Sequence, residues 1–148
     1  MLETRVCIDV DDIDKAVAFY TAGLGLTVGR RFGSGWVELL GATSPIDLLG
    51  TPAGSACCPG APALQRDYQR HWTPVHLDFL VGDLEAAVER VVALGATLDR
   101  EIQEQDYGRM ANLADPFGNG FCLLEFRDEG YDALAASAAE PLPVEDKV

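Results

Sequence analysis

The chain has 148 residues, a formal net charge of −13 and a hydrophobic fraction of 48%. This length suits one domain or two half-size modules that share a core, because a module of roughly 60 residues alone buries too little surface to be robust. Such an acidic chain repels nucleic acid phosphates, and it contains no uninterrupted apolar run of about 18 residues, so neither nucleic acid binding nor a membrane span is expected.

The first 50 residues predict a strand, a helix and three further strands. Residues 5–10 are rich in β-branched types, which suits a half-buried strand. Asp11 or Asp12 can cap a helix, and Gly23 and Gly25 can end it. The apolar positions that recur at helical spacing are Ile13, Ala16, Val17, Tyr20 and Leu24. The further strands are predicted at 26–32, 35–40 and 46–49.

Residues 51–72 are predicted to be a linker, because Gly54, Pro59, Gly60 and Pro62 interrupt any regular element. A short helix is predicted near 63–70. Linkers of this length can lie over a binding site, but a passive surface strap is the more general case and is the expectation here.

The second half repeats the first. The segment Val81-Gly-Asp-Leu-Glu-Ala-Ala-Val recurs 71 residues after Val10-Asp-Asp-Ile-Asp-Lys-Ala-Val, again behind a short apolar strand. The predicted elements are strands at 75–80, 97–102, 109–114 and 120–126 and a helix with cap Asp83, buried positions Leu84, Ala87, Val88 and Val91, and terminator Gly95. The predicted organisation is therefore a βαβββ module at 1–50, the linker at 51–72, a second βαβββ module at 73–127 and an acidic, partly mobile tail at 128–148.

Cysteine usage and the start of the chain favour the cytoplasm. Cys7, Cys57, Cys58 and Cys122 have no paired CxxC spacing for structural zinc. The start lacks a basic segment followed by an apolar one, so no secretory signal is expected and the thiols are expected to be free.

Several motifs resemble the glyoxalase, bleomycin-resistance and extradiol-dioxygenase superfamily, also called the vicinal oxygen chelate superfamily. They are Leu24-Gly-Leu, the helix opening Asp83-Leu-Glu-Ala-Ala-Val and the turn and strand Asp115-Pro-Phe-Gly-Asn-Gly-Phe-Cys-Leu-Leu-Glu. The resemblance covers residues 5–126 and is closest to the glyoxalase-like branch. It implies an α+β fold in which two βαβββ modules form a cupped, partly open mixed sheet, and it implies a homodimer whose modules pair within one chain or between two.

The resemblance also places a metal site. Enzymatic members hold a divalent metal in the cup with residues on the first and last strands of each module. The first-strand positions correspond to Arg5 and His76, and the last-strand positions to Asp47 and Cys122. A guanidinium is a permanent cation and does not ligate a metal, so the pattern is broken at Arg5. Glu125 lies an odd number of residues from Cys122 and is expected on the opposite face of the strand, outside the cup.

Three hypotheses remain for these positions. In one, Asp47, His76 and Cys122 hold a zinc, iron, manganese or nickel ion. In the second, which we favour, no metal is bound, Arg5 pairs with Asp47, and His76 is a polar contact or a general base. In the third, all four are ordinary strand residues, with Cys122 as a small buried hydrophobe.

Further side chains could complete a binding cup. Glu38, Arg109 and Asn112 lie on middle strands, and aromatic walls could come from Trp36, Phe32, Trp72 and Tyr107. The favoured function is a small-molecule binding protein with a degenerate metal site and a sequestration or resistance role. The alternative is a metal-dependent enzyme, either a glyoxalase-like lyase or isomerase or an extradiol-type dioxygenase. A third class is a regulatory or assembly module that acts through its dimer surface.

Overall fold

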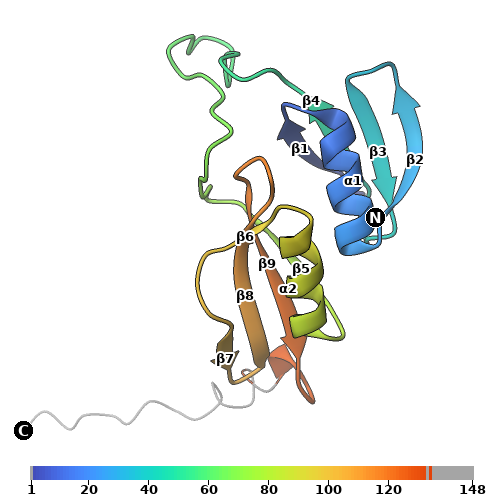
Figure 1. The fold of residues 1–148 in the computed structure, drawn as a ribbon, viewed down its shortest axis with the longest axis vertical. Coiled ribbons are helices and arrows are strands. Elements are labelled where there is room, and N and C mark those ends of the chain that lie inside the picture. Colours follow the sequence, from blue (N-terminus) through green and yellow to red (C-terminus); the bar gives the residue numbers. More distant parts are fainter. Residues whose placement is uncertain (1, 133, 135–148) are drawn as a thin grey trace, which may run out of the picture.

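A computed structural model gives the fold and describes residues 2–132 and 134. Most of the predicted tail at 128–148 lies outside these residues. The chain folds into two α/β modules that lie end to end, each with one helix against one sheet, and an extended linker joins them along one side (Figure 1).

The first module has the predicted order of elements. They are β1 (Val6–Val10), α1 (Ile13–Leu24), β2 (Thr27–Phe32), β3 (Trp36–Leu40) and β4 (Ile46–Gly50). The sheet order is β1-β4-β3-β2, with β1 parallel to β4. The Asp12 carboxylate accepts a bond from the backbone N–H of Lys15, and Gly25 ends the helix in the left-handed region at φ 73°.

The second module repeats this arrangement with one more strand. Its elements are β5 (Leu77–Leu80), α2 (Leu84–Ala93), β6 (Thr97–Leu98), β7 (Gln103–Gln105), β8 (Gly108–Ala114) and β9 (Gly120–Phe126). The sheet order is β5-β9-β8-β6, and β7 also pairs with β8. The single strand predicted at 97–102 is wrong beyond Leu98. The chain leaves the sheet at Asp99, whose carboxylate binds Arg70 of the linker.

The two modules share one core. Helices α1 and α2 contact each other, and buried side chains from both modules form a single cluster. The ring of Phe19 on α1 meets Phe121 of the second module edge to face, at 6.3 Å between centroids. The α+β fold with two cupped, open mixed sheets is therefore confirmed, and each module buries its apolar face partly against the other.

The linker differs from its prediction. Residues 63–70 form no helix, because backbone groups there bond across to an earlier part of the linker: Cys57 N–H donates to the Leu64 carbonyl at 2.7 Å. The chain then crosses the turn before β9, where His71 N–H donates to the Gly118 carbonyl at 2.9 Å. The linker is tied to the second module.

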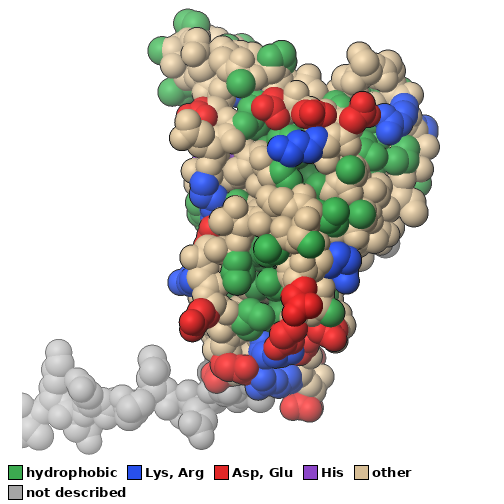
Figure 2. Space-filling model, viewed as in Figure 1, with side chains coloured by type: hydrophobic (Ala, Val, Ile, Leu, Met, Phe, Trp, Pro, Cys, Tyr) green, Lys and Arg blue, Asp and Glu red, His purple; other side chains and the backbone are tan. Residues whose placement is uncertain are grey.

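The surface carries both signs of charge. Figure 2 shows acidic and basic side chains next to one another, with hydrophobic side chains exposed between them over both modules. Among the described residues, no helix combines the length and the apolar character needed to cross a membrane.

Candidate functional site

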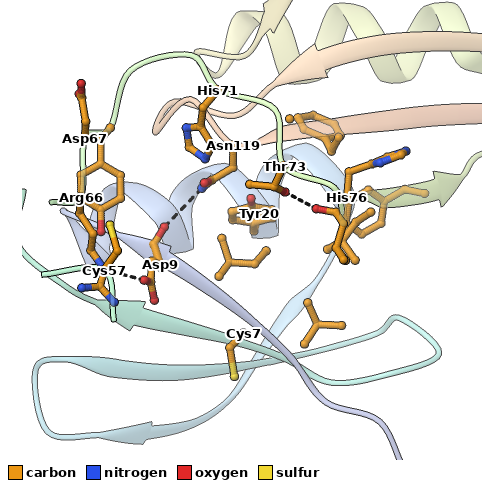
Figure 3. A pocket seen from close by; sticks show the side chains of 18 of the residues that line it. Cys7, Asp9, Tyr20, Cys57, Arg66, Asp67, His71, Thr73, His76 and Asn119 are labelled. Atoms are coloured by element: carbon orange, nitrogen blue, oxygen red, sulfur yellow. Dashed lines mark hydrogen bonds and ion pairs between the residues drawn. The ribbon is translucent and has the colours of Figure 1, made fainter. Parts of the chain in front are cut away.

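A cavity of about 560 Å³ lies between the edge strands β1 and β5 and is covered by the linker (Figure 3). Edge strand β1 contributes Val6 to Asp9, and β5 contributes Leu77 and Phe79. In Figure 3 the linker passes over one side of the cavity and Tyr20 of α1 lies near its centre. The cavity is therefore built where the two modules and the linker meet.

Its deeper wall is largely apolar. Phe79 and Phe121 line it and contact each other edge to face at 6.0 Å. The ring of Tyr20 is buried there, and its hydroxyl is already bound to the Asp115 carboxylate at 2.6 Å. Apolar side chains with few free polar groups suit an organic ligand with a flat or aliphatic surface.

The outer wall is polar and comes mainly from the linker. Arg66 Nε donates to the Asp9 carboxylate at 2.7 Å, and the Asn119 side-chain amide donates to the Asp9 carbonyl at 3.3 Å. His71 and Thr73 also line this side. The linker therefore supplies a wall of the cavity, and whether it is more than a passive surface strap depends on whether the cavity binds a ligand.

The first module brings four charged side chains together on the sheet face away from α1. Arg5 binds Asp47 through two bonds of 2.9 and 2.8 Å and reaches Glu38 at 2.8 Å. Arg30 binds the same Glu38 through two bonds of 2.7 and 2.5 Å. The Trp36 indole N–H donates to Asp47 at 3.0 Å. The predicted partners Arg5 and Asp47 therefore meet, and Glu38 joins them.

These ion pairs fix the charge state of both carboxylates. Hydrogen bonds from Arg30 and then Arg5 lower the pKa of Glu38 to about 2. The hydrogen bonds from Arg5 likewise lower the pKa of Asp47. Groups that stay ionised through the neutral range do not exchange protons there, so this cluster is poorly suited to general acid or base catalysis.

The second module has an equivalent cluster with different chemistry. His76 Nε2 lies 3.2 Å from Asp78, which pairs across the sheet with Cys122. The Asn112 amide donates to the Cys122 sulfur at 3.1 Å. Burial, and then the nearby Asp78 carboxylate, raises the pKa of the Cys122 thiol to about 11. A protonated thiol is a weak nucleophile, so the Cys122 thiol by itself is a weak nucleophile at neutral pH.

Within one chain, the four positions implied by the resemblance lie in two clusters, one with Arg5 and Asp47 and the other with His76 and Cys122. Asp47 accepts hydrogen bonds from Arg5 and Trp36, and no contact among the described residues joins it to His76 or Cys122. A guanidinium at the first-strand position opposes a bound dication. Within the described residues of one chain, Asp47, His76 and Cys122 therefore do not gather into one cluster. Within the second module alone, ligand atoms of His76, Asp78 and Cys122 lie within 4.8 Å of one another.

Arg109 was a candidate binding residue, and its position excludes it from both clusters and from the cavity. It lies opposite Glu125 in the sheet and binds Glu125 and Glu85 on the helix side. Glu125 itself accepts the Leu84 N–H at the start of α2, so it is outside the cup as predicted. Arg109 and Asn112 lie an odd number of residues apart on β8, so their side chains point to opposite faces of the sheet.

Two of the four aromatic residues predicted as walls, Trp72 and Tyr107, lie in separate places. Trp72 stacks at a tilt on His76, with 4.4 Å between ring centroids, and stands at the edge of the cavity over Gly120. Tyr107 packs against Phe126 and Tyr131, outside the residues that line the cavity. Of the predicted candidates, His76 lines the cavity directly.

Most residues of the cavity were not predicted. Asp9 lies in the first strand and Arg66 in the polar part of the linker, and the sequence identified neither as a candidate for the site. The alternation of β1 could have marked Asp9 as facing away from the core, together with Cys7. No sequence signal locates Arg66 opposite Asp9, 57 residues earlier.

Comparison with known proteins relates the whole of this architecture to one family. Residues 5–124 match the sequence model of a family described as "Glyoxalase-like domain". The chain is 36% identical over 130 residues to the anthracycline biosynthesis protein DnrV of Streptomyces peucetius. That match covers 87% of this chain and 42% of DnrV, so the chain spans less than half the length of this relative.

Solved structures share the fold at low sequence identity. A glyoxalase/bleomycin resistance protein/dioxygenase family enzyme from Burkholderia phytofirmans PsJN superposes with a TM-score of 0.64 at 22% identity, covering 83% of this chain and 97% of that one. TnmS3, an antibiotic binding protein from Streptomyces sp. CB03234, gives a TM-score of 0.60 at 21% identity, covering 86% and 97%. At these sequence identities, the two comparisons show a shared fold.

Proposed function

The chain belongs to the glyoxalase-like domain family, and from this premise we propose that it binds a small organic molecule in the cavity between β1, β5 and the linker. The binding needs no metal at the four positions shared by the two modules. The ligand class that fits best is a flat, largely apolar aromatic compound with a few oxygen substituents. Its capture would serve sequestration, resistance or delivery of that compound.

The observation that carries this proposal is the cavity itself. Its volume of about 560 Å³ lies within the range of roughly 300 to 1,000 Å³ typical of small-molecule sites. Phe79, Phe121 and Tyr20 offer aromatic surface, and Arg66, His71 and Asn119 offer polar contacts at the outer wall. The names of DnrV, an anthracycline biosynthesis protein, and of TnmS3, an antibiotic binding protein, support a small organic ligand.

A blocking substitution tests the site. Thr73 is exposed and lines the cavity, so Thr73→Trp fills space with little effect on the core. A ligand that binds the folded state raises the melting temperature by mass action. Anthracyclines and related aromatic polyketides are therefore screened by thermal melts, and each hit is measured by titration calorimetry. The wild type should be stabilised and Thr73→Trp should lose most of the shift.

The matched control is Leu64→Trp. Leu64 is an exposed linker residue that does not line the cavity, so this variant should bind as the wild type does. Equal binding by Thr73→Trp would place the ligand elsewhere. If none of the compounds stabilises the wild type, the proposal fails, and a role as a regulatory or assembly module would take its place.

A second candidate is a metal-dependent enzyme, because the ligand atoms of His76, Asp78 and Cys122 converge in the second module. Nitrogen, oxygen and sulfur ligands together suit zinc or iron. This candidate predicts that dialysed protein retains about one equivalent of metal and that His76→Ala loses both the metal and any turnover. Unchanged metal content in His76→Ala would rule out this second candidate.

Dimerisation and location are proposals as well. We expect a homodimer, which light scattering coupled to gel filtration measures. We expect the cytoplasm as its compartment, which cell fractionation measures.

A further inference from the structure

One arginine nitrogen bridges two buried carboxylates in the first module. Arg5 Nη2 lies 2.8 Å from Asp47 and 2.8 Å from Glu38. The side chains of Glu38 and Asp47 are only 4% and 3% exposed, whereas that of Arg5 is 42% exposed. Two carboxylates that share so little water require a cation between them.

We infer that the Arg5 guanidinium is a fixed internal cation that keeps divalent metal out of the first module. The group occupies the place from which a metal ion would contact both Asp47 and Glu38. This inference goes beyond ligand binding in the cavity, since Arg5 is not one of the residues that line the cavity. If this inference holds, the residue at position 5 decides whether the first module can bind a metal.

Charge supports the inference. Asp47 and Glu38 bring two negative charges, and Arg5 and Arg30 bring two positive ones, so the cluster is neutral. Without Arg5, Arg30 still neutralises Glu38, but among the described residues Asp47 keeps only the neutral Trp36 indole as a hydrogen-bond partner. The cluster then carries an uncompensated buried negative charge that a cation from solution can neutralise.

The residue of the second module that is equivalent to Arg5 suggests a substitution that would test this inference. Position 76 holds a histidine, and its Nε2 lies beside the Asp78 carboxylate. Arg5→His therefore places an imidazole near Asp47 and Glu38, and Cys7, the cross-strand partner of Asp47, is next to them. An imidazole with two carboxylates is a common set of ligands for nickel, manganese, iron or zinc.

The experiment compares metal retention in a background of His76→Ala, which removes the histidine of the second-module cluster. Parent and Arg5→His proteins are incubated with zinc, nickel or manganese, dialysed, and analysed for bound metal and for melting temperature. Arg5→His should retain about one equivalent and bind at least about tenfold more tightly than the parent, with a metal-dependent rise in melting temperature. The further substitution Asp47→Asn in the Arg5→His protein should abolish this gain in metal binding.

The matched control is Arg31→His. Arg31 is also an arginine of the first sheet, but it lies near Asp14 on the helix side, so a histidine there should add no metal site. Arg5→Lys keeps a cation and should remain metal-free. If Arg5→His does not fold in metal-free buffer, refolding with and without nickel replaces the dialysis, and only the nickel sample should fold.

Two results would overturn the inference. One is a folded Arg5→His protein that binds no more metal than its parent, or no refolding with nickel. The other is a parent that already binds a metal through Asp47. Ligand binding is measured in parallel with an Arg5→His protein that keeps His76 and should equal that of the wild type, so failure of the metal result does not bear on the cavity.

Discussion

The hydroxyl of Tyr20 donates a hydrogen bond to the carboxylate of Asp115 across 2.6 Å, although the two residues are 95 positions apart. Asp115 also accepts bonds from the backbone N–H groups of Phe117 and Asn119, at 2.8 and 2.9 Å. Burial and then the adjacent carboxylate raise the pKa of Tyr20 well above its usual value. The pair ties the first helix to the turn that shapes the end of the cavity.

Tyr20→Phe should destabilise the fold by about 2 kcal/mol, the usual cost of removing a buried bond to a charged acceptor. Chemical denaturation followed by circular dichroism measures the change in the free energy of unfolding. Tyr131→Phe is the control, because Tyr131 is half-exposed and contacts other aromatic rings rather than a carboxylate. Equal effects of the two substitutions would show that the Asp115 bond contributes little.

Acid should weaken the fold through Glu38. Its pKa in the folded state is about 2, below the ordinary value of 4.5, so the folded state favours the ionised form. The resulting stability is present above about pH 4.5 and is lost as the pH falls toward 2. Asp47 acts in the same direction, because its pKa is also lowered.

Glu38→Gln should therefore lose less stability than the wild type between pH 6 and pH 3, as measured by denaturation at each pH. The control is Glu89→Gln on α2, because Glu89 is exposed and forms no ion pair among the described residues. It should follow the wild-type pH profile. A Glu38→Gln profile parallel to that of the wild type would contradict the assigned ion pairs.

The four thiols should differ in reactivity. Cys7, Cys57 and Cys58 are exposed and Cys122 is buried, with a thiol pKa raised to about 11. Because the thiolate is the reactive form, Ellman's reagent at pH 8 should modify three thiols quickly in the native protein and the fourth only after unfolding. Cys122→Ser should leave the fast phase unchanged. A fast phase of four thiols would mean that the second-module cluster is open to solvent.

Gly118 should be intolerant of any side chain. Its φ is +80°, and an added Cβ would lie 1.9 Å from the Gln69 carbonyl oxygen of the linker. Gly33 has a similar φ of +61° but open space around it. Gly33→Ala should cost about 1 kcal/mol from backbone strain alone, and Gly118→Ala should cost more than about 2 kcal/mol as well as loosening the linker.

Thermal melts and hydrogen exchange at the amide of His71, which bonds to Gly118, report both effects. Similar melting temperatures for the two glycine variants would contradict the close approach of the linker to this turn.

The sequence was informative wherever local chemistry sets the structure. Asp12 and Asp83 cap their helices as predicted, because a carboxylate there satisfies backbone N–H groups within three residues. The repeat between the modules identified matching positions, and Arg5 paired with Asp47 could be anticipated from charge. Glu125 was correctly assigned to the face away from Cys122 by the two-residue period of a strand.

The errors arose where distant segments meet. Arg109 was a candidate for the site, and its partners Glu85 and Glu125 hold it on the helix side. The linker was expected to form a short helix near 63–70, but it forms none, and its path depends on Asp9 and on the turn that contains Gly118. Such contacts leave no periodic pattern in the sequence, because each partner is set by the packing of another module.

The sequence by itself determined the two βαβββ modules and the break in their symmetry at Arg5, because periodicity, capping and residue charge are local properties. Only the tertiary structure decided that Glu38 joins Arg5 and Asp47, that Asp78 rather than Asp47 lies beside His76 and Cys122, and that the linker closes a cavity. Each of these depends on strand register and on the packing of one module against the other, and both are fixed by the summed burial of side chains far apart in the chain.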